Sequence, residues 1–157
     1  MTRTALISTL ASLSILAATA ASAQSQAPSA QTVAVQTANL TVTFSGITQA
    51  KGAIMMAMFD SQAAYEGDDA KPVQAVVIPV TGSSVSAAFQ GLAPGSYAIK
   101  LYHDVNGDGK MGSNPFGMPT EPYAFSNNAK GNMGPAKWAA AAFSVVAGAN
   151  TQSITID

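Results

Sequence analysis

Apolar and polar side chains alternate along much of the chain from residue 40 onward. Leu40, Val42 and Phe44 alternate with threonine and serine, a period of two that is typical of a strand with one buried face. The segment 53–60, AIMMAMFD, is apolar at almost every position, which predicts a central strand covered on both sides. The same reading predicts further strands over 73–80, 85–89 and 96–103.

The C-terminal segment AFSVVAGANTQSITID predicts a β-hairpin. Phe143 and Val145 fall on one arm, Ile154 and Ile156 on the other, and the turn falls at 148–150. Helical periodicity is nearly absent, although the alanines of PAKWAAAAF favour one helical turn before the last strands. The pattern therefore predicts an all-β fold, a two-sheet antiparallel β-sandwich of about seven strands. Its expected core contains Leu40, Val42, Phe44, Met56, Met58, Tyr97, Ile99, Leu101, Phe143 and Ile154.

One long segment, from 104 to about 140, shows no clear strand or helix pattern. Loops of this length in compact domains are usually functional or disordered. This one contains four large aromatic residues and many glycines and prolines, which fix turns. We therefore expect an ordered loop with its own apolar cluster, anchored by Phe116, Tyr123, Phe125 and Trp138.

The first 23 residues have the pattern of a secretory signal peptide. Arg3 precedes an uncharged apolar stretch that ends in Ala21-Ser22-Ala23, and we expect cleavage after Ala23. Residues 24–38 are uncharged and rich in Gln, Ser and Ala, so we expect a flexible leader there. The folded domain is then expected over 39–157, in a periplasmic or secreted protein without a membrane span after cleavage.

Cysteine usage and charge narrow the possible functions. The chain has no cysteine, which excludes a thiol nucleophile and a zinc–thiolate site. Export without disulfides is typical of a bacterial envelope protein. The formal net charge is −1 and no basic cluster is present, which argues against a nucleic-acid partner.

The stretch HDVNGDGKMG, residues 103–112, matches the first half of a calcium-binding loop. Asp104, Asn106 and Asp108 occupy the first, third and fifth positions, where side-chain oxygens bind the ion. Gly109 at the sixth position allows the sharp bend, and Lys110 at the seventh would offer its backbone carbonyl. These residues are therefore candidate ligands of a Ca²⁺ ion.

The acid that closes such a loop is missing, because the twelfth position is Pro115. Glu121 is the nearest acid that could complete the site, and the affinity would then be weak, about 10⁻⁴ to 10⁻³ M. The alternative is that Asp and Asn before glycine form Asx-turns that need no ion. The residues leave both interpretations open.

His103 is the only histidine. Beside Asp104 it could be a metal ligand or a general base. It also ends a predicted strand, on the face that carries Leu101. That position favours a packed histidine bonded to a loop carbonyl.

Two long segments, LAPGSYAIKLYHDVNGDGKM and NPFGMPTEPYAFSNNAKGNMGPAKWAAAAFSV, resemble the family called domain of unknown function 2141. The resemblance covers roughly residues 40–157 and departs from the family pattern at Pro122, where relatives often carry glycine. It implies an exported bacterial β-sandwich similar to transthyretin-like, immunoglobulin-like or carboxypeptidase-regulatory modules, and it implies no particular activity. The motifs that carry it are Pro94–Tyr97, His103–Lys110, Phe116–Pro119, Tyr123–Asn128, Gly134–Pro135 and Ala142–Phe143.

Two functional hypotheses follow from these observations. The first is a non-catalytic binding or structural module at the cell envelope that uses the loop 104–140, with or without a calcium ion, to hold an envelope or extracellular ligand. The alternative is a metal-dependent enzyme or a periplasmic metal carrier that uses His103, Asp104 and Asp108.

Overall fold

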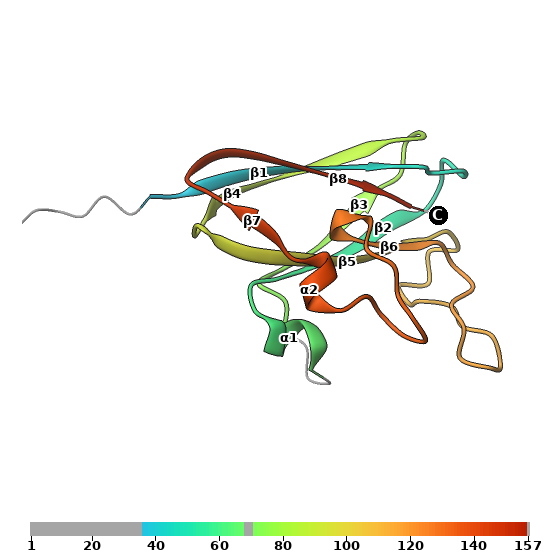
Figure 1. Ribbon diagram of the computed structural model, residues 1–157. Helices are drawn as coiled ribbons and strands as arrows, with labels where there is room; N and C mark the ends of the chain where they lie inside the picture. Colours follow the sequence, from blue (N-terminus) through green and yellow to red (C-terminus); the bar gives the residue numbers. More distant parts are fainter. Residues whose placement is uncertain (1–35, 68–70, 157) are drawn as a thin grey trace, which may run out of the picture. The chain divides into compact units, whose positions relative to one another are not determined.

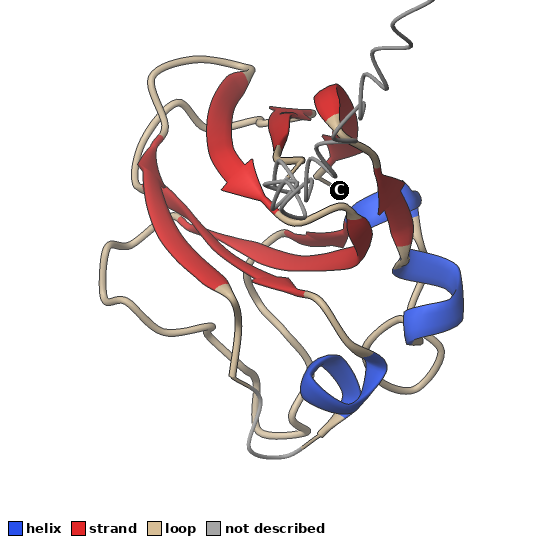
Figure 2. Cartoon of the chain, turned by 90° about the vertical axis from the view of Figure 1, so that its left-hand side faces the viewer, coloured by secondary structure: helices blue, strands red, loops and turns tan. Residues whose placement is uncertain are grey.

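The computed structural model describes residues 36–67 and 71–156. Two β-sheets face each other, and the short helical segments do not lie between them (Figure 1, Figure 2). The predicted all-β sandwich is therefore confirmed. The expected signal peptide and nearly all of the expected leader lie outside the described residues.

The smaller sheet has the strand order β4-β1-β8, and the larger has the order β3-β2-β5-β6, with β7 also paired to β5. The smaller sheet comprises β1 (Ala38–Ser45), β4 (Val85–Leu92) and β8 (Gly148–Thr155). The larger comprises β2 (Ala53–Phe59), β3 (Gln74–Pro79), β5 (Gly95–Asp104), β6 (Tyr123–Phe125) and β7 (Phe143–Val145). The helical segments are α1 (Gln62–Glu66), the 3₁₀ helix η1 (Ser126–Asn128) and α2 (Trp138–Ala141).

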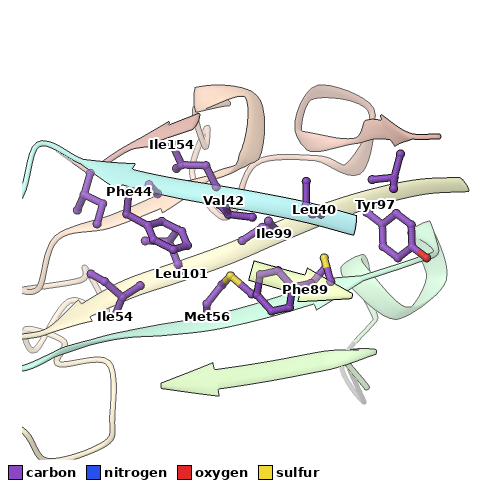
Figure 3. Packing of buried hydrophobic residues seen from close by; sticks show 14 of the residues in the cluster. Leu40, Val42, Phe44, Ile54, Met56, Phe89, Tyr97, Ile99, Leu101 and Ile154 are labelled. Atoms are coloured by element: carbon purple, nitrogen blue, oxygen red, sulfur yellow. The ribbon is translucent and has the colours of Figure 1, made fainter. Parts of the chain in front are cut away.

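One apolar core fills the space between the sheets (Figure 3). In β1 the apolar residues of the alternating pattern point inward, and Thr41 between them is exposed. Nine of the ten predicted core residues are buried, and the tenth, Phe143, is partly buried against them. The period of two therefore assigned the inner faces of β1 and β5 correctly.

The predicted C-terminal hairpin is wrong. β7 pairs with β5 in the larger sheet, whereas β8 pairs with β1 in the smaller sheet and runs parallel to it. The sandwich is therefore not purely antiparallel. The chain crosses between sheets at 146–147, where Asn150 accepts the Val146 N–H and donates to the carbonyls of Val146 and Gly148. These bonds satisfy the backbone polar groups at the point where the chain changes sheet. The turn-forming residues therefore form a crossover between sheets instead of a hairpin.

A second apolar cluster lies on the outer face of the larger sheet, beneath α1 and α2. It contains the fully buried Tyr65, and its ring meets Phe59 and Trp138 edge to face, with centroids 5.5 and 5.8 Å apart. The predicted helical turn before β7 is α2. It is tied to α1 because the Glu66 carboxylate accepts the Trp138 N–H at 2.9 Å. The buried members of this cluster are Phe59, Tyr65, Ala98, Phe125, Ala136 and Ala141.

The segment Ser126–Asn128 fastens this cluster to the rest of the sandwich. The buried Ser126 hydroxyl accepts the Ile99 N–H and donates to the Ala141 carbonyl, at 2.9 and 2.6 Å. Asn127, at a left-handed φ of 58°, donates to the Ala142 carbonyl, and the Asn128 side chain accepts the Thr155 N–H. Asparagine tolerates this conformation better than other side chains do. These three residues therefore bond to β5, α2 and β8.

We expect Ile99→Ala to lower the free energy of unfolding by about 2–5 kcal/mol, because Ile99 is fully buried between the sheets and its loss leaves a cavity. Ser153→Ala, on the exposed face of β8, is the matched control and should change it by less than about 0.5 kcal/mol. Urea denaturation of both variants measures the difference. A loss at Ile99 as small as that of the control would mean that this face of β5 does not lie in the core.

Candidate functional site

The loop that joins β5 to β6 is wound around the Asp104 carboxylate. This side chain is 3% exposed, and its two oxygens accept the N–H groups of Gly107 and Gly109 at 2.7 and 2.9 Å. Both glycines have positive φ values, 76° and 74°, which side chains with a Cβ rarely adopt. The sequence Asn-Gly-Asp-Gly therefore brings two backbone donors to a single buried acid.

The next two polar residues of the motif form Asx-turns at the surface. Asn106 accepts the Asp108 N–H at 3.0 Å through its side-chain oxygen. Asp108 in turn accepts the Lys110 N–H at 2.8 Å and the Asn106 amide at 3.1 Å. Each polar side chain of the motif is thus bonded within the motif itself.

Glu121 closes the loop from its other end. Its carboxylate oxygens accept the N–H groups of Val105 and Gly112 at 3.1 and 3.0 Å. The Tyr102 hydroxyl adds a bond to the Gly109 carbonyl at 3.1 Å. Burial raises the pKa of Tyr102, and the negative charges of Asp104, Glu121 and Asp108 raise it further. Glu121 therefore orders the loop by accepting two of its backbone N–H groups, and its predicted role as a Ca²⁺ ligand stays a prediction.

Within residues 36–67 and 71–156, no three His, Cys, Asp or Glu side chains gather closely enough to hold a metal ion. The donors that meet the carboxylates are backbone N–H groups, which carry partial positive charge, so the loop has an ion-free means of ordering. Carboxylate oxygens have further lone pairs, and a Ca²⁺ ion bound through Asp104, Asn106, Asp108, Glu121 and the Lys110 carbonyl stays a prediction.

His103 is a packed residue of the inner face, as its position in the strand predicted. It is 1% exposed, its Nε2 lies 2.7 Å from the Lys51 carbonyl oxygen, and its backbone N–H donates to the Pro122 carbonyl. Consecutive strand residues leave a sheet on opposite faces, so His103 and Asp104 diverge. Gly52 lies against the same strand end, where an added Cβ would come within 2.0 Å of the Asp104 carbonyl oxygen.

The expected aromatic anchors of the long loop divide into two groups. Phe125 is buried and Trp138 packs partly buried beside it, so the predicted apolar cluster exists. Phe116, however, is 90% exposed, and Tyr123 is 38% exposed. The short hairpin around Phe116 is ordered by Asn114 instead, whose side-chain oxygen accepts the N–H groups of Phe116 and Met118. Phe116 as an anchor was therefore a wrong expectation.

A groove on the outer face of the larger sheet was not foreseen from the sequence. Its volume is about 430 Å³. The second apolar cluster covers one end of this face, and the groove occupies the uncovered part. In the sheet register Met55 lies between Val77 and Tyr102, and Ala57 lies between Ala75 and Lys100. The groove is lined by Met55, Met56, Ala57, Ala75, Val76, Val77, Lys100, Leu101, Tyr102, Met111, Phe125 and Pro135.

The sequence did contain a signal for this surface. β2 is apolar on both faces, and that pattern was interpreted as complete burial. Helices and loops cover only part of the outer face, so Val77 remains 61% exposed and Met111 37% exposed. The opposite sheet differs, because its outer face carries polar residues such as Thr41, Thr151 and Ser153.

Among the described residues that line the groove, Lys100 is the one that carries a charge, and its ammonium group already has partners. Its Nζ donates to the Tyr65 carbonyl at 2.5 Å and lies 4.3 Å from the Tyr65 ring centroid and 5.4 Å from that of Phe59. Burial lowers the pKa of Lys100, against the opposing influence of Glu66. The ammonium group therefore bonds to α1, and the aliphatic part of the Lys100 side chain lines the groove.

The family of uncharacterised proteins conserved in bacteria, domain of unknown function 2141, has a model that matches residues 42–154. The chain belongs to this family. Neither the comparison with curated proteins nor that with solved structures finds a match. Two of the motifs that carry the resemblance, His103–Lys110 and Tyr123–Asn128, contain the Asp104 loop and the Ser126–Asn128 segment. Among the described residues, none of the helices has the length and apolar character needed to cross a membrane.

We expect Asp104→Asn to lower the free energy of unfolding by about 1.5–3 kcal/mol, because a buried charged acceptor of two N–H groups is replaced by a neutral amide. Asp108→Asn is the control: its carboxylate is exposed and an amide oxygen can still accept the Lys110 N–H, so the cost should stay below about 0.5 kcal/mol. Urea unfolding in a chelating buffer separates the two.

The same variants test the calcium prediction. With about 5 mM Ca²⁺ and a dissociation constant of about 0.5 mM, wild type should gain RT ln 11, about 1.4 kcal/mol. The variant that combines Asp104→Asn with Asp108→Asn should gain nothing, and Mg²⁺ should not substitute because it requires a tighter octahedral site. If millimolar Ca²⁺ does not change the free energy of unfolding of wild type, the calcium prediction is wrong. The backbone N–H donors then account for the order of the loop.

Proposed function

We propose that this protein is an exported, non-catalytic binding module whose ligand-binding surface is the apolar groove on the larger sheet. The observation that carries the proposal is a groove of about 430 Å³ on a β-sheet face that is apolar and partly uncovered. Concave apolar surfaces of this volume suit small molecules or the side chains of a partner. The outer face of the opposite sheet is polar over the described residues, which suits an apolar ligand less well.

The long loop contributes to this surface, in keeping with the hypothesis drawn from the sequence. Met111 directly follows Lys110 of the Asp104 loop, and Pro135 lies between η1 and α2, so two parts of the long loop supply residues that line the groove. The bonds from Asp104 and Glu121 hold Met111 near the sheet before a ligand arrives. A wall that is already ordered loses little conformational entropy on binding, which favours affinity.

The polar residues that suggested chemistry support a binding role better than a catalytic one. Asp104 and Glu121 accept backbone N–H groups, and His103 bonds the Lys51 carbonyl. Each contributes to loop order through those bonds. The ligand we propose is therefore recognised by apolar contact, as an uncharged apolar molecule or an uncharged apolar segment of an envelope component.

A fluorescent, uncharged apolar probe such as N-phenyl-1-naphthylamine tests the groove. We expect wild type to bind it with enhanced fluorescence, and Met111→Asp to weaken binding by about tenfold, because an apolar contact is lost and a charge enters the wall. Met118→Asp is the matched control, since Met118 is 62% exposed in the same loop and does not line the groove. Equal binding by both variants, or none by wild type, would refute the groove as a ligand site.

Export rests on the apolar stretch that precedes Ala21-Ser22-Ala23. We expect protein recovered from the periplasm or the medium of a bacterial host to have Gln24 as its first residue, as N-terminal sequencing would show. Ala23→Arg is the informative variant, because a large charged residue at the cleavage position should leave uncut precursor. Wild-type protein that starts at Met1 and stays in the cytosol would contradict export.

A further inference from the structure

β3 is an uncharged strand at the edge of the larger sheet. It pairs with β2 on one side, and no strand of the described chain pairs with its other side. The segment 72–80, PVQAVVIPV, has no charged residue, and Val73 and Val77 are 42% and 61% exposed. Proteins usually protect such an edge with lysine or proline, because an open edge is a template for another strand, and in β3 proline occupies only the last position.

The phase of the hydrogen bonds shows which groups of β3 face outward. The Val80 N–H donates to the Gly52 carbonyl at 3.0 Å, so residue 80 belongs to a hydrogen-bonded pair with β2. In an antiparallel ladder such pairs recur at every second residue, at 78, 76 and 74. The N–H and C=O groups of Ala75 and Val77 therefore point away from β2. The His103 N–H bond to Pro122 gives the same phase across β5.

Both ends of this edge lack an outward donor. Pro79 has no N–H, and the Val73 N–H turns inward to the Met58 carbonyl at 2.8 Å. The edge therefore presents two donors, those of Ala75 and Val77, each beside its own carbonyl. Within the described part of the chain, no hydrogen bond from another segment reaches either residue.

We infer that a second copy of this chain pairs with β3 in antiparallel orientation, about a two-fold axis at Val76. In this register Ala75 faces Val77 of the second copy, and Val77 faces its Ala75. Each pair exchanges two N–H···O bonds, so four hydrogen bonds form and every outward donor is satisfied. Val73 and Pro79 then face each other, and neither leaves an N–H without a partner.

The other open edges fit a second copy less well. On β8 the outward Thr155 N–H is already accepted by Asn128. On β4 the exposed side chains beside the edge are Ser86, Ala88 and Gln90, which offer little apolar area. At β3, by contrast, the exposed Val77 lies beside the second copy's Ala75 on the same face.

This pairing goes beyond the proposed function and adds to it. The two-fold axis is perpendicular to the sheet, so the outer faces of both copies lie on the same side. Val77 lines the groove, and the register places it next to Ala75 of the second copy, which lines that copy's groove. The two apolar grooves then become neighbours on one continuous sheet.

Sedimentation equilibrium from about 1 µM to 1 mM of the purified protein tests the pairing. The average mass of wild type should rise from monomer toward dimer. Ala75→Pro removes an outward donor without touching the ladder to β2, since proline is tolerated on an edge with its nitrogen facing out. It should weaken association by about 10- to 100-fold, because each dimer loses two hydrogen bonds.

Ala88→Pro is the matched control. Ala88 is an exposed alanine on β4, and the β1–β4 register together with the Ser84 bond to the Phe44 carbonyl indicates that its N–H also points outward. We expect this variant to associate as wild type does. Should Ala75→Pro fail to fold by near-ultraviolet circular dichroism, Val77→Lys replaces it, because a charge at the two-fold edge opposes pairing.

Amide hydrogen exchange supplies a second measurement. The Ala75 and Val77 amides should gain protection as the protein concentration rises, while those of Ser86 and Ala88 should not. A monomer at every concentration would overturn the inference, and so would a dimer that resists Ala75→Pro and Val77→Lys or is broken by Ala88→Pro. Loss of probe binding in Met111→Asp is independent of these outcomes, so the two proposals can fail separately.

Discussion

The central position of β5 is the constraint on which the structure depends, because its inner face is buried in the core and its outer face is covered at one end. Its inner face, with Tyr97, Ile99, Leu101 and His103, closes the sandwich core. Its outer face carries Ala98 under α1 and α2, and β2, β6 and β7 pair along its edges. A strand in this position must end where the apolar layers end, and it ends at Asp104.

Polar side chains in this protein act mainly by accepting or donating bonds to the backbone of irregular segments. Asp104 and Glu121 order the loop after β5, and Ser126 fastens the outer cluster. Asn150 forms the crossover between sheets. Buried backbone donors must be satisfied, and outside the ladders these side chains satisfy them. The long segment thus acquires a fixed shape with little regular structure, and it holds Met111 and Pro135 in place beside the sheet.

The two outer faces of the sandwich differ in polarity, so only one of them suits an apolar ligand. The smaller sheet exposes threonine and serine, as a solvated face does. The larger sheet is apolar on both faces, but the short helices cover only one end of it. The groove is a consequence of this incomplete cover, and the open edge of β3 borders the same face, so that both involve Val77. Apolar area left in water costs free energy, which a ligand or a second strand would recover.

The sequence by itself determined the fold class, the inner face of most strands and the placement of His103, because a period of two is a local property of the chain. It also placed the turns around Asp104, since carboxylates and glycines two or three residues apart form their bonds locally. The crossover at 146–147 was decided by tertiary structure: the same turn residues fit a hairpin, and only the pairing of β8 with β1 distinguishes the two. The exposure of Phe116, the partial cover over Met55 and the free edge of Ala75 and Val77 were also decided there. Each depends on which segments, distant in sequence, pack against a face or an edge, and no local pattern of residues specifies that.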